Sequence, residues 1–462
     1  MSASQTQDGS QRLVSVPNLL LVPSMNSLLH CFRPTAQIGC WVIHLLVALQ
    51  CRAEVVTPSA VHRLAGSVPD RHPGLQALEL RAGAAKAQAE ATRRWADPTL
   101  RAGGIGFTSR GPLASEEGDI ALGVTQTLPI FGKESAARAV AEAEAKTARE
   151  TADVRIPMLQ RDLMERLLQL ALVHRSIDLA EADRVWLQRI LDTLEARHAS
   201  GKVSAPQLLQ LRNEVSQAET RLKLLRIDSQ DAAARINRVL GQPIDHAVGS
   251  WELPTKAAPI TFQPDWPRHA LAAEPQLRVA RTLSNEAAAR VDATRRSGRP
   301  NLSLGLDSRQ YSGDGGLRNG AATLSLSLPW FNRDQYRKDL TRDRLRLEAA
   351  HREVANLEAE VTLEIHHWLT RIESARIRAE LAEETLLPRI RNALDTATAA
   401  LSAGPGELRD TLDLRRQWLD TKSSQANAIA EQWSAIAELL LLCGWHDLPQ
   451  SPSPLSSPSP AP

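Results

Sequence analysis

The sequence predicts a mainly α-helical fold with a small β part, in which one arrangement of elements occurs twice. The first observation is a long-range repeat: Leu128-Pro129-Ile130-Phe131 is matched by Leu328-Pro329-Trp330-Phe331 about 200 residues later. The second is a sustained apolar spacing of three and four residues, which is typical of long coiled-coil helices. The third is a pair of segments in each half whose apolar residues alternate with polar ones. We therefore expect two structural repeats, each with a helix, a β-hairpin and a long α-hairpin.

The predicted domain organisation follows this repeat. We expect four segments, at residues 1–53 (upstream extension and signal peptide), 54–262 (first repeat), 263–446 (second repeat) and 447–462 (disordered Pro/Ser-rich tail). The hydrophobic period sets the elements within each repeat. The expected strands are 99–109 and 119–128 in the first repeat, and 301–309 and 320–328 in the second. The expected long helices are 132–199 and 204–240, followed by 333–402 and 406–443.

The composition favours helices and disfavours several classes of function. Aromatic residues make up only 4% of the chain, and a net charge of +2 provides no strong field for nucleic acid. Cys31, Cys40 and Cys51 all lie near the amino terminus, which rules out a disulfide framework and disfavours a cysteine metal centre. The chain contains no Walker loop, dinucleotide fingerprint or GxSxG motif. We therefore expect neither an enzyme nor a cofactor.

The amino-terminal segment has the pattern of a secretory leader. An apolar run over Ile38–Leu49 precedes small residues at the positions that would direct cleavage after Ala53. Either Met1 or Met25 can be the true start. A membrane anchor is an alternative, although the run is short for a transmembrane helix. Acylation of Cys51 is a second alternative and stays open at this stage.

The strand-like segments carry apolar residues at every second position. In the second repeat Leu302, Leu304 and Leu306 alternate with small or polar residues. A soluble β-layer packed on helices would show this pattern, and so would strands that face lipid. No other segment is apolar enough for a transmembrane helix, so a membrane-spanning form would have to use strands. Four strands leave two open edges, which lipid does not tolerate, and closure would then need two or three chains.

The helical segments show the spacing of coiled coils. The return helix of the first repeat keeps it from Leu208 to Val239. The return helix of the second repeat keeps it from Leu408 to Cys443, with Arg415 and Lys422 at two of the positions. Pro157 should kink the outgoing helix of the first repeat, because it lacks a backbone N–H.

These features together resemble the outer membrane efflux protein family, the TolC-like channels of Gram-negative bacteria, over residues 69–445. Gly132-Lys133 after Phe131, and Phe331-Asn332-Arg333 after Trp330, are most similar to the CzcC-like heavy-metal branch. The resemblance implies a homotrimeric α/β barrel. Four transmembrane β-strands from each chain would form a 12-stranded barrel in the outer membrane lipid, and the helices would form a periplasmic tunnel. An exported precursor with a signal peptide agrees with that location.

The resemblance also implies partners and a cargo. A periplasmic adaptor (membrane fusion) protein and an inner-membrane pump of the resistance-nodulation-division (RND) type would dock at the helical end. The chain would be a passive duct without a cofactor, exporting substrates that the pump delivers. Heavy-metal cations are the expected cargo on the subfamily likeness alone, and an organic compound stays open.

Two aspartates carry the most specific expectation from the resemblance. Asp410 and Asp413 lie six and nine residues after Gly404, where TolC-like relatives place the acidic rings of the periplasmic aperture. Rings of carboxylates favour cations and can be bridged by them. The first repeat has Gln207 and Gln210 at the same offsets. The alternative is that both aspartates simply stabilise the amino-terminal turn of a helix.

Two further groups of residues are candidate functional positions. Turns with glycines suited to positive φ are the expected adaptor-docking tips, at Gly201, Lys202, Val203, Gly404, Pro405 and Gly406. The strand-to-helix junctions are expected at Pro129, Phe131, Pro329, Trp330 and Phe331. The aromatic residues there are either anchors at the membrane interface or ordinary core residues.

Other functions and sites have weaker support in the sequence. A periplasmic adaptor normally carries one long α-hairpin, and a coiled-coil scaffold would lack the alternating strands. A periplasmic hydrolase has the least support. Glu364, His366 and His367 suggest metal ligands, but adjacent histidines point to different sides of a helix, so we expect no metal site. His174 is expected to pack between helices rather than to act as a catalyst.

Overall fold

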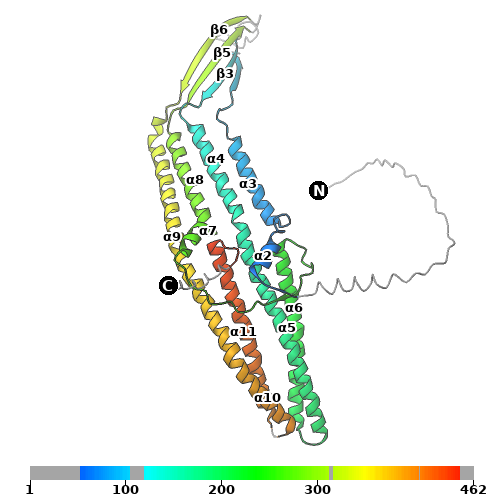
Figure 1. The fold of residues 1–462 in the computed structure, drawn as a ribbon. Helices are drawn as coiled ribbons and strands as arrows, with labels where there is room; N and C mark the ends of the chain where they lie inside the picture. Colours follow the sequence, from blue (N-terminus) through cyan, green and yellow to red (C-terminus); the bar gives the residue numbers. More distant parts are fainter. Residues whose placement is uncertain (1–52, 105–118, 312–315, 405, 448–462) are drawn as a thin grey trace, which may run out of the picture. The chain divides into compact units, whose positions relative to one another are not determined.

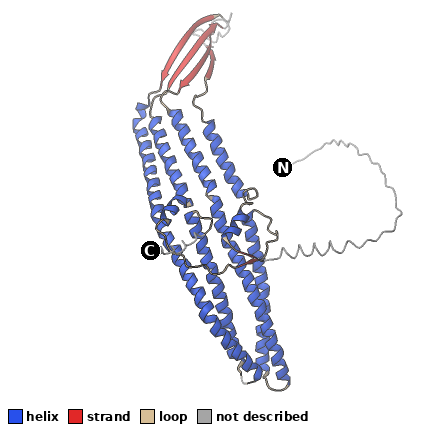
Figure 2. Cartoon of the chain, in the orientation of Figure 1, coloured by secondary structure: helices blue, strands red, loops and turns tan. Residues whose placement is uncertain are grey.

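The computed structural model describes residues 53–104, 119–311, 316–404 and 406–447. These residues belong to one compact unit that starts at Ala53. The predicted signal peptide, the predicted Pro/Ser-rich tail and Pro405 lie outside the described residues. Helices dominate the fold and strands form a small part of it (Figure 2). The predicted mainly helical fold with a small β part is confirmed.

Four strands form one antiparallel sheet in the order β2-β3-β5-β6. Their bounds are β2 Thr99–Gly104, β3 Asp119–Leu128, β5 Leu302–Tyr311 and β6 Leu317–Leu326. The central pair joins the two halves of the chain, since β3 pairs with β5 from Asp119↔Tyr311 to Leu128↔Leu302. The outer strands β2 and β6 each pair on one side only. Both edges of the sheet are therefore open among the described residues.

The apolar face of this sheet is exposed in the single chain. Leu306 and Leu324 are 64% and 69% exposed, and Val124 and Leu304 are also exposed. The pairing Val124↔Leu306 places these side chains on one face, because alternate residues point to the same side of a strand. The opposite face carries small and hydroxyl residues, including Thr125 opposite Gly305. Among the described residues, no helix buries these leucines, which differs from the predicted alternative of a β-layer packed on helices.

The strands continue into four helices, α3 (Pro73–Ala91), α4 (Lys133–Asp153), α8 (Pro275–Ser297) and α9 (Arg333–Glu380) (Figure 1). A 3₁₀ turn, η1 (Pro329–Asn332), precedes α9. The chain leaves regular helix geometry at Val154, between α4 and α5 (Arg155–Ala199). The carbonyl of Asp153 loses its usual partner because Pro157 has no N–H, and this accounts for the interruption of the helix at Val154. The remaining hairpin helix of the first half is α6 (Ala205–Leu240).

The second half contains an irregularity that the first half lacks. Helix α9 runs into a π-helix, η2 (Leu381–Leu386), before α10 (Leu387–Ala403) and the return helix α11 (Leu408–Cys443). Pro388 follows directly in the first turn of α10. Two short helices, α2 (Pro58–Ala65) and α7 (Trp266–Ala273), pack beside the long ones. Within the described ranges, no helix is both long and apolar enough to cross a membrane.

A second small sheet and a strap, which we define as residues 253–263, lie against the helices. Strand β1 (Glu54–Val55) pairs in parallel with β4 (Trp251–Glu252). The strap after β4 is held by the side chain of Gln432 on α11, which accepts from the Ala257 N–H at 2.9 Å and donates to the Ala257 carbonyl at 3.2 Å. Gln432 is fully buried, so this pairing satisfies polar groups that water cannot reach.

The hydrophobic core consists of three clusters along the helix seams. One joins α2, α3 and α5 to α6, a second joins α7, α8 and α9 to α11, and the third lies towards the turns of the two long hairpins. Fully buried side chains such as Leu167, Leu211 and Leu412 occupy them. Each contributes about 1.5–3 kcal/mol by leaving water. The stripe predicted along α6 is thus the face that packs against α5.

Candidate functional site

The turn between α5 and α6 is a closed helix stop. Gly201 has φ 75° and its N–H donates to the His198 carbonyl at 2.9 Å, while the Lys202 N–H reaches back to the Arg197 carbonyl. These are the bonds with which a positive-φ residue satisfies the last carbonyls of a helix. Ser204 and Gln207 then cap the start of α6 in a reciprocal capping box. Local hydrogen bonds therefore close this turn.

The turn between α10 and α11 is built differently. Gly404 has φ 124°, and both its N–H and that of Gly406 donate to the Ala400 carbonyl, at 3.0 and 3.1 Å. A side chain at Gly406 would collide with the backbone of Ala400 and Leu401, so only glycine fits there. The Arg197 guanidinium of the first turn donates to the Leu401 carbonyl. The structure therefore brings the two predicted tips together; Pro405 lies between described residues.

Asp410 and Asp413 lie on the exposed side of the first turns of α11. Thr411 and Leu412 between them are buried, which directs the two carboxylates outward. Asp410 forms no ion pair with any described residue, and Asp413 pairs with Arg416 at 3.4 Å. The geometry leaves both carboxylates accessible to ions.

A buried charge network lies just above these aspartates. The Arg415 guanidinium of α11 donates two hydrogen bonds to the Asp183 carboxylate of α5, at 2.6 and 2.8 Å. It donates a third to Glu214 of α6 at 2.9 Å. The side chains of Arg415 and Asp183 are each only 8% exposed. One guanidinium thus joins the α5–α6 hairpin to α11, with both carboxylates satisfied by planar hydrogen bonds.

Arg416 extends this network to the surface. It donates to the second oxygen of Glu214 at 2.6 Å and also contacts Asp413. Burial opposes ionisation of Glu214, but the hydrogen bonds and charges of the two arginines outweigh it and hold its pKa below the ordinary value. Burial likewise opposes the charge on Arg415, yet its two acidic partners raise its pKa. Both shifts favour the charged forms of Glu214 and Arg415, and Arg416 connects Asp413 to this buried pair.

The sequence interpretation did not identify Asp183 or Glu214 as partners. Arg415 was visible as a charged residue at a position of the apolar stripe in α11, and that is the signal that points to a buried ion pair. The partners lie 232 and 201 residues away in the chain. No local spacing links such positions, so only the packed helices reveal them.

The strand-to-helix junctions are exposed and are tied to each other. Trp330 and Phe331 are 53% and 79% exposed, and Pro129, Phe131 and Pro329 are partly exposed. The guanidinium of Arg299 donates to the Phe131 carbonyl at 3.0 Å, and that of Arg296 donates to the Gly132 carbonyl at 3.2 Å. The aromatic side chains at the end of the second repeat's strands are thus surface groups rather than core residues.

The histidines considered as metal ligands or as a catalyst pack against neighbouring residues. His366 stacks on Phe262 with ring centroids 5.1 Å apart, and His367 packs edge-on against Trp368. The ring of His174 faces the backbone of Trp251, within 3.2 Å of its carbonyl oxygen. No group of three potential ligands occurs within the described ranges. Burial raises the pKa of the Cys443 thiol to about 12, which keeps it protonated.

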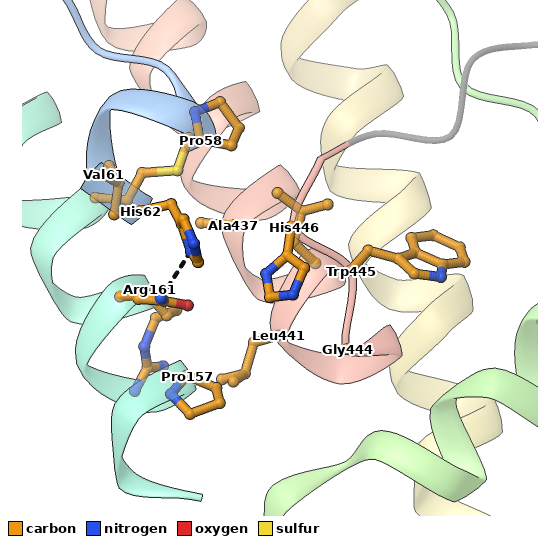
Figure 3. A pocket seen from close by; sticks show the side chains of 13 residues that line it. Pro58, Val61, His62, Pro157, Arg161, Ala437, Leu441, Gly444, Trp445 and His446 are labelled. Carbon is orange, nitrogen blue, oxygen red and sulfur yellow. Dashed lines mark hydrogen bonds between the residues drawn. The ribbon is translucent and has the colours of Figure 1, made fainter. Parts of the chain in front are cut away.

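Figure 3 shows a small cavity between α2, α5 and α11. Its walls are mostly apolar, and the His62 and His446 rings approach each other to 5.0 Å at its polar side. Gln160 contacts the His62 ring nitrogen at 3.2 Å. The volume is about 90 Å³, well below the usual size of ligand pockets. The cavity is a packing gap and not a substrate site.

The arrangement defines a class of protein: long helical hairpins that continue into an antiparallel sheet with an exposed apolar face. The model of the family described as outer membrane efflux protein matches residues 64–242 and 266–444. The chain therefore belongs to the outer membrane efflux protein family. Comparison with curated protein sequences gives no match.

Solved structures share this fold. The outer-membrane channel OprN superposes with a TM-score of 0.72 at 18% identity, covering 86% of this chain and 93% of that one. The outer membrane protein VceC from Vibrio cholerae gives 0.71 at 19% identity, covering 84% and 96%. CusC gives 0.72 at 16% identity, covering 83% and 92%. The superpositions thus cover nearly the whole length of each of these three proteins.

Proposed function

We propose that the protein is the outer membrane channel of a tripartite efflux system, a passive duct without catalytic activity. The observation that carries the proposal is the sheet, whose leucine face is exposed and whose strands pass directly into the long helices. A leucine-rich face is stable against lipid and costly against water. Family membership and the shared fold of solved outer membrane channels support the same function.

The proposed assembly is a homotrimer. Among the described residues, strands β2 and β6 have free edges, and unpaired backbone groups are not tolerated in lipid. Three copies would supply twelve strands and close the sheet as a barrel in the outer membrane of a Gram-negative bacterium. The family model matches twice, at residues 64–242 and 266–444, and this supports the proposed division into two repeats at 54–262 and 263–446. Pro129, Phe131, Pro329, Trp330 and Phe331 would then lie at the periplasmic membrane interface.

The proposed aperture is at the other end of the helices. Threefold symmetry would bring three copies each of Asp410 and Asp413 around the axis, where their exposed carboxylates would favour cations. The buried Arg415 network would set the position of α11 relative to α5 and α6.

The proposed partners and cargo follow from the same location. A periplasmic adaptor would dock on the tips formed by Gly201, Lys202, Val203, Gly404, Pro405 and Gly406, and an RND-type inner-membrane pump would supply energy. Heavy-metal cations are proposed as cargo from the junction motifs of the CzcC-like branch. The rival adaptor or scaffold function is disfavoured by the second hairpin and the exposed sheet.

The decisive experiment is membrane fractionation followed by measurement of oligomeric state and conductance. The full-length protein, expressed in a Gram-negative host, is expected in the outer membrane fraction. In detergent it should be trimeric, and in planar bilayers it should form conducting pores. A detergent-independent monomer without conductance would exclude the channel.

A further inference from the structure

We infer that a second cavity, larger than the one in Figure 3, binds an organic anion, a carboxylate or sulfonate that carries an apolar body. This cavity lies between α5, the segment that includes β4, the π-helix η2 and α11. Its volume is about 930 Å³, which lies within the usual range of ligand pockets. Neither Asp410 nor Asp413 lines it, and the inference does not depend on the proposed channel function.

Two helix faces form the long walls of the cavity. The lining residues of α5 are at positions 171, 174, 175, 177 and 178, and those of α11 are at positions 422, 425, 426 and 429. Residues three and four apart share one side of a helix, so each helix turns one face towards the cavity. The segment 250–256, which includes β4 and the first strap residues, forms another wall, and Glu383 of η2 completes the lining.

Lys422 is a cation without a counterion in this lining. The residue is partly buried, and it forms no ion pair with a described residue. Burial is the largest cause that lowers its pKa. The carboxylate that opposes this shift, Glu383, lies 3.8 Å from the ammonium of Lys256 instead. A charge withdrawn from water is costly without a partner, so an anion in the cavity would stabilise Lys422.

The other charged groups of the lining differ in their exposure to water. Arg175 is exposed, and its positive charge is the second cause, after burial, that lowers the pKa of Lys422. The two cations therefore act on the same space. Asp178 and Glu252 also line the cavity, but both are exposed, so water stabilises their charges. The charge that a ligand would have to balance is therefore positive.

The remaining lining suits the body of an organic molecule. Ile177, Ile429 and Leu253 supply apolar surface, and Gln425 and Thr255 supply an amide and a hydroxyl group. A small inorganic anion would fill only a minor part of a cavity of this size. An organic anion can place its charged group beside Lys422 and remove its apolar part from water.

The walls are held in place without a ligand. Trp251 is only 5% exposed, and its carbonyl oxygen lies 3.2 Å from a ring nitrogen of His174. The indole N–H of Trp433 donates to the Thr255 carbonyl at 2.8 Å, which ties the strap to α11. A preformed pocket needs little ordering when a ligand binds, and this favours affinity.

The test is calorimetric titration of the full-length protein in a nonionic detergent with naphthalene-2-carboxylate as the probe. Titration into protein-free micelles is subtracted. We expect the carboxylate to bind, and the neutral naphthalene-2-carboxamide to bind about tenfold more weakly or not at all, because it lacks the charge that pairs with Lys422. Failure of the carboxylate to bind, or equal affinities for the two molecules, would overturn the inference.

Variants separate a binding role of Lys422 from a structural one. Lys422→Met keeps the length of the side chain and should weaken binding of the carboxylate by about tenfold or more. The Tm of the ligand-free variant should be unchanged or higher, because an unpaired and partly buried ammonium is lost. Lys223→Met, at an exposed position of α6, is the matched control and should leave the affinity unchanged.

A change of the opposite sign is expected from the acidic side of the cavity. Asp178→Asn should strengthen binding of the carboxylate by about threefold, because it removes a negative charge from the wall. Unchanged affinity in a folded Lys422→Met variant, or weaker binding in Asp178→Asn, contradicts an anion site at Lys422.

Discussion

The two long helical hairpins, α5–α6 and α9–α11, differ in the side chains along their packed helix faces. Along α6 the stripe that meets α5 is apolar, and a local capping box starts α6 after the turn. The equivalent stripe of α11 includes Arg415 and Lys422, and its partner helix contains the π-helix η2. Two helices that pack through apolar side chains can shift along each other at a small cost in free energy. A buried guanidinium is stable only when particular carboxylates lie opposite it. The comparison indicates that the first hairpin supplies stability and the second supplies a defined register.

The irregular part of the second hairpin has its own electrostatic ties. Lys256 of the strap reaches the acids of the π-helix region, at 3.6 Å from Glu380, 3.8 Å from Glu383 and 3.3 Å from Glu384. Burial, followed by the nearby charge of Arg175, lowers the pKa of Lys422 on the facing helix. π-Bulges occur often at functional positions. The second hairpin thus combines a helix irregularity with a cluster of charged side chains.

Removing the buried cation should have the largest effect. Arg415→Leu leaves the buried Asp183 carboxylate without its arginine and leaves Glu214 with Arg416 alone, and it should cost about 3–5 kcal/mol of unfolding free energy. Chemical denaturation of the detergent-solubilised protein measures it. Arg416→Ala, at an exposed position, is the matched control and should cost under about 1 kcal/mol. Equal losses for the two variants would contradict a special role for Arg415.

An apolar truncation in the first hairpin should have a comparable but smaller effect. Leu211→Ala creates a cavity at a fully buried position of α6 and should cost about 2–5 kcal/mol. Leu209→Ala on the exposed side should change the unfolding free energy by less than about 0.5 kcal/mol in a dissociated protomer. A larger loss at Leu209 than at Leu211 would mean that the assignment of the packed face is wrong.

Acid should weaken the second half through Asp343. Its carboxylate accepts from Arg342 and from Thr294 of α8 at 2.7 Å, and the Arg342 hydrogen bonds, against the opposing effect of burial, lower its pKa to about 2. Because the folded pKa is depressed, this stabilisation is complete above the unfolded value of 3.8 and is lost as the pH falls towards 2. The expected contribution is about 1–2 kcal/mol.

Thermal unfolding between pH 7 and pH 2.5 measures this dependence. Asp343→Asn should flatten the decline at the acid end and lower the Tm at neutral pH. An unchanged acid slope in the variant would assign the pH dependence to other carboxylates, among which Glu214 also has a lowered pKa.

The exposed aspartates should affect conduction more than stability. Asp410→Ala combined with Asp413→Ala should raise conductance at low voltage and remove block by divalent cations in planar bilayers. Both residues are exposed, so the unfolding free energy should change by less than about 1 kcal/mol. Gln207→Ala with Gln210→Ala, at the matching offsets of the first hairpin, is the control. Unchanged conductance and block in the aspartate variant would remove the aperture assignment.

Local chemistry made much of the architecture predictable. Alternating leucines such as Leu302, Leu304 and Leu306 place a strand and its apolar face, because side chains point to opposite sides with period two. Glycines with positive φ at Gly201 and Gly404 were expected at the helix stops, and they occur there. The placement of Asp410 and Asp413 as a ring depends on other copies of the chain and stays a prediction.

Long-range contacts were not predictable in the same way. The pairing of β3 with β5, the link from Arg415 to Asp183 and the hold of Gln432 on Ala257 join residues far apart in the chain. A charged residue in an apolar stripe, such as Arg415, indicates that a buried residue of opposite charge is present. It does not indicate which residue that is. The π-helix at Leu381–Leu386 likewise has no distinct local signal apart from Pro388, which follows it.

The sequence by itself determined where helices, strands and turns lie and which face of each is apolar, because these depend on residue period and backbone preference over a few neighbours. Only the tertiary structure decided which helices share a charge network, where β1 is held along α5, and which strand edges stay open. Those properties depend on distances between segments hundreds of residues apart. Packing, rather than local pattern, sets such distances.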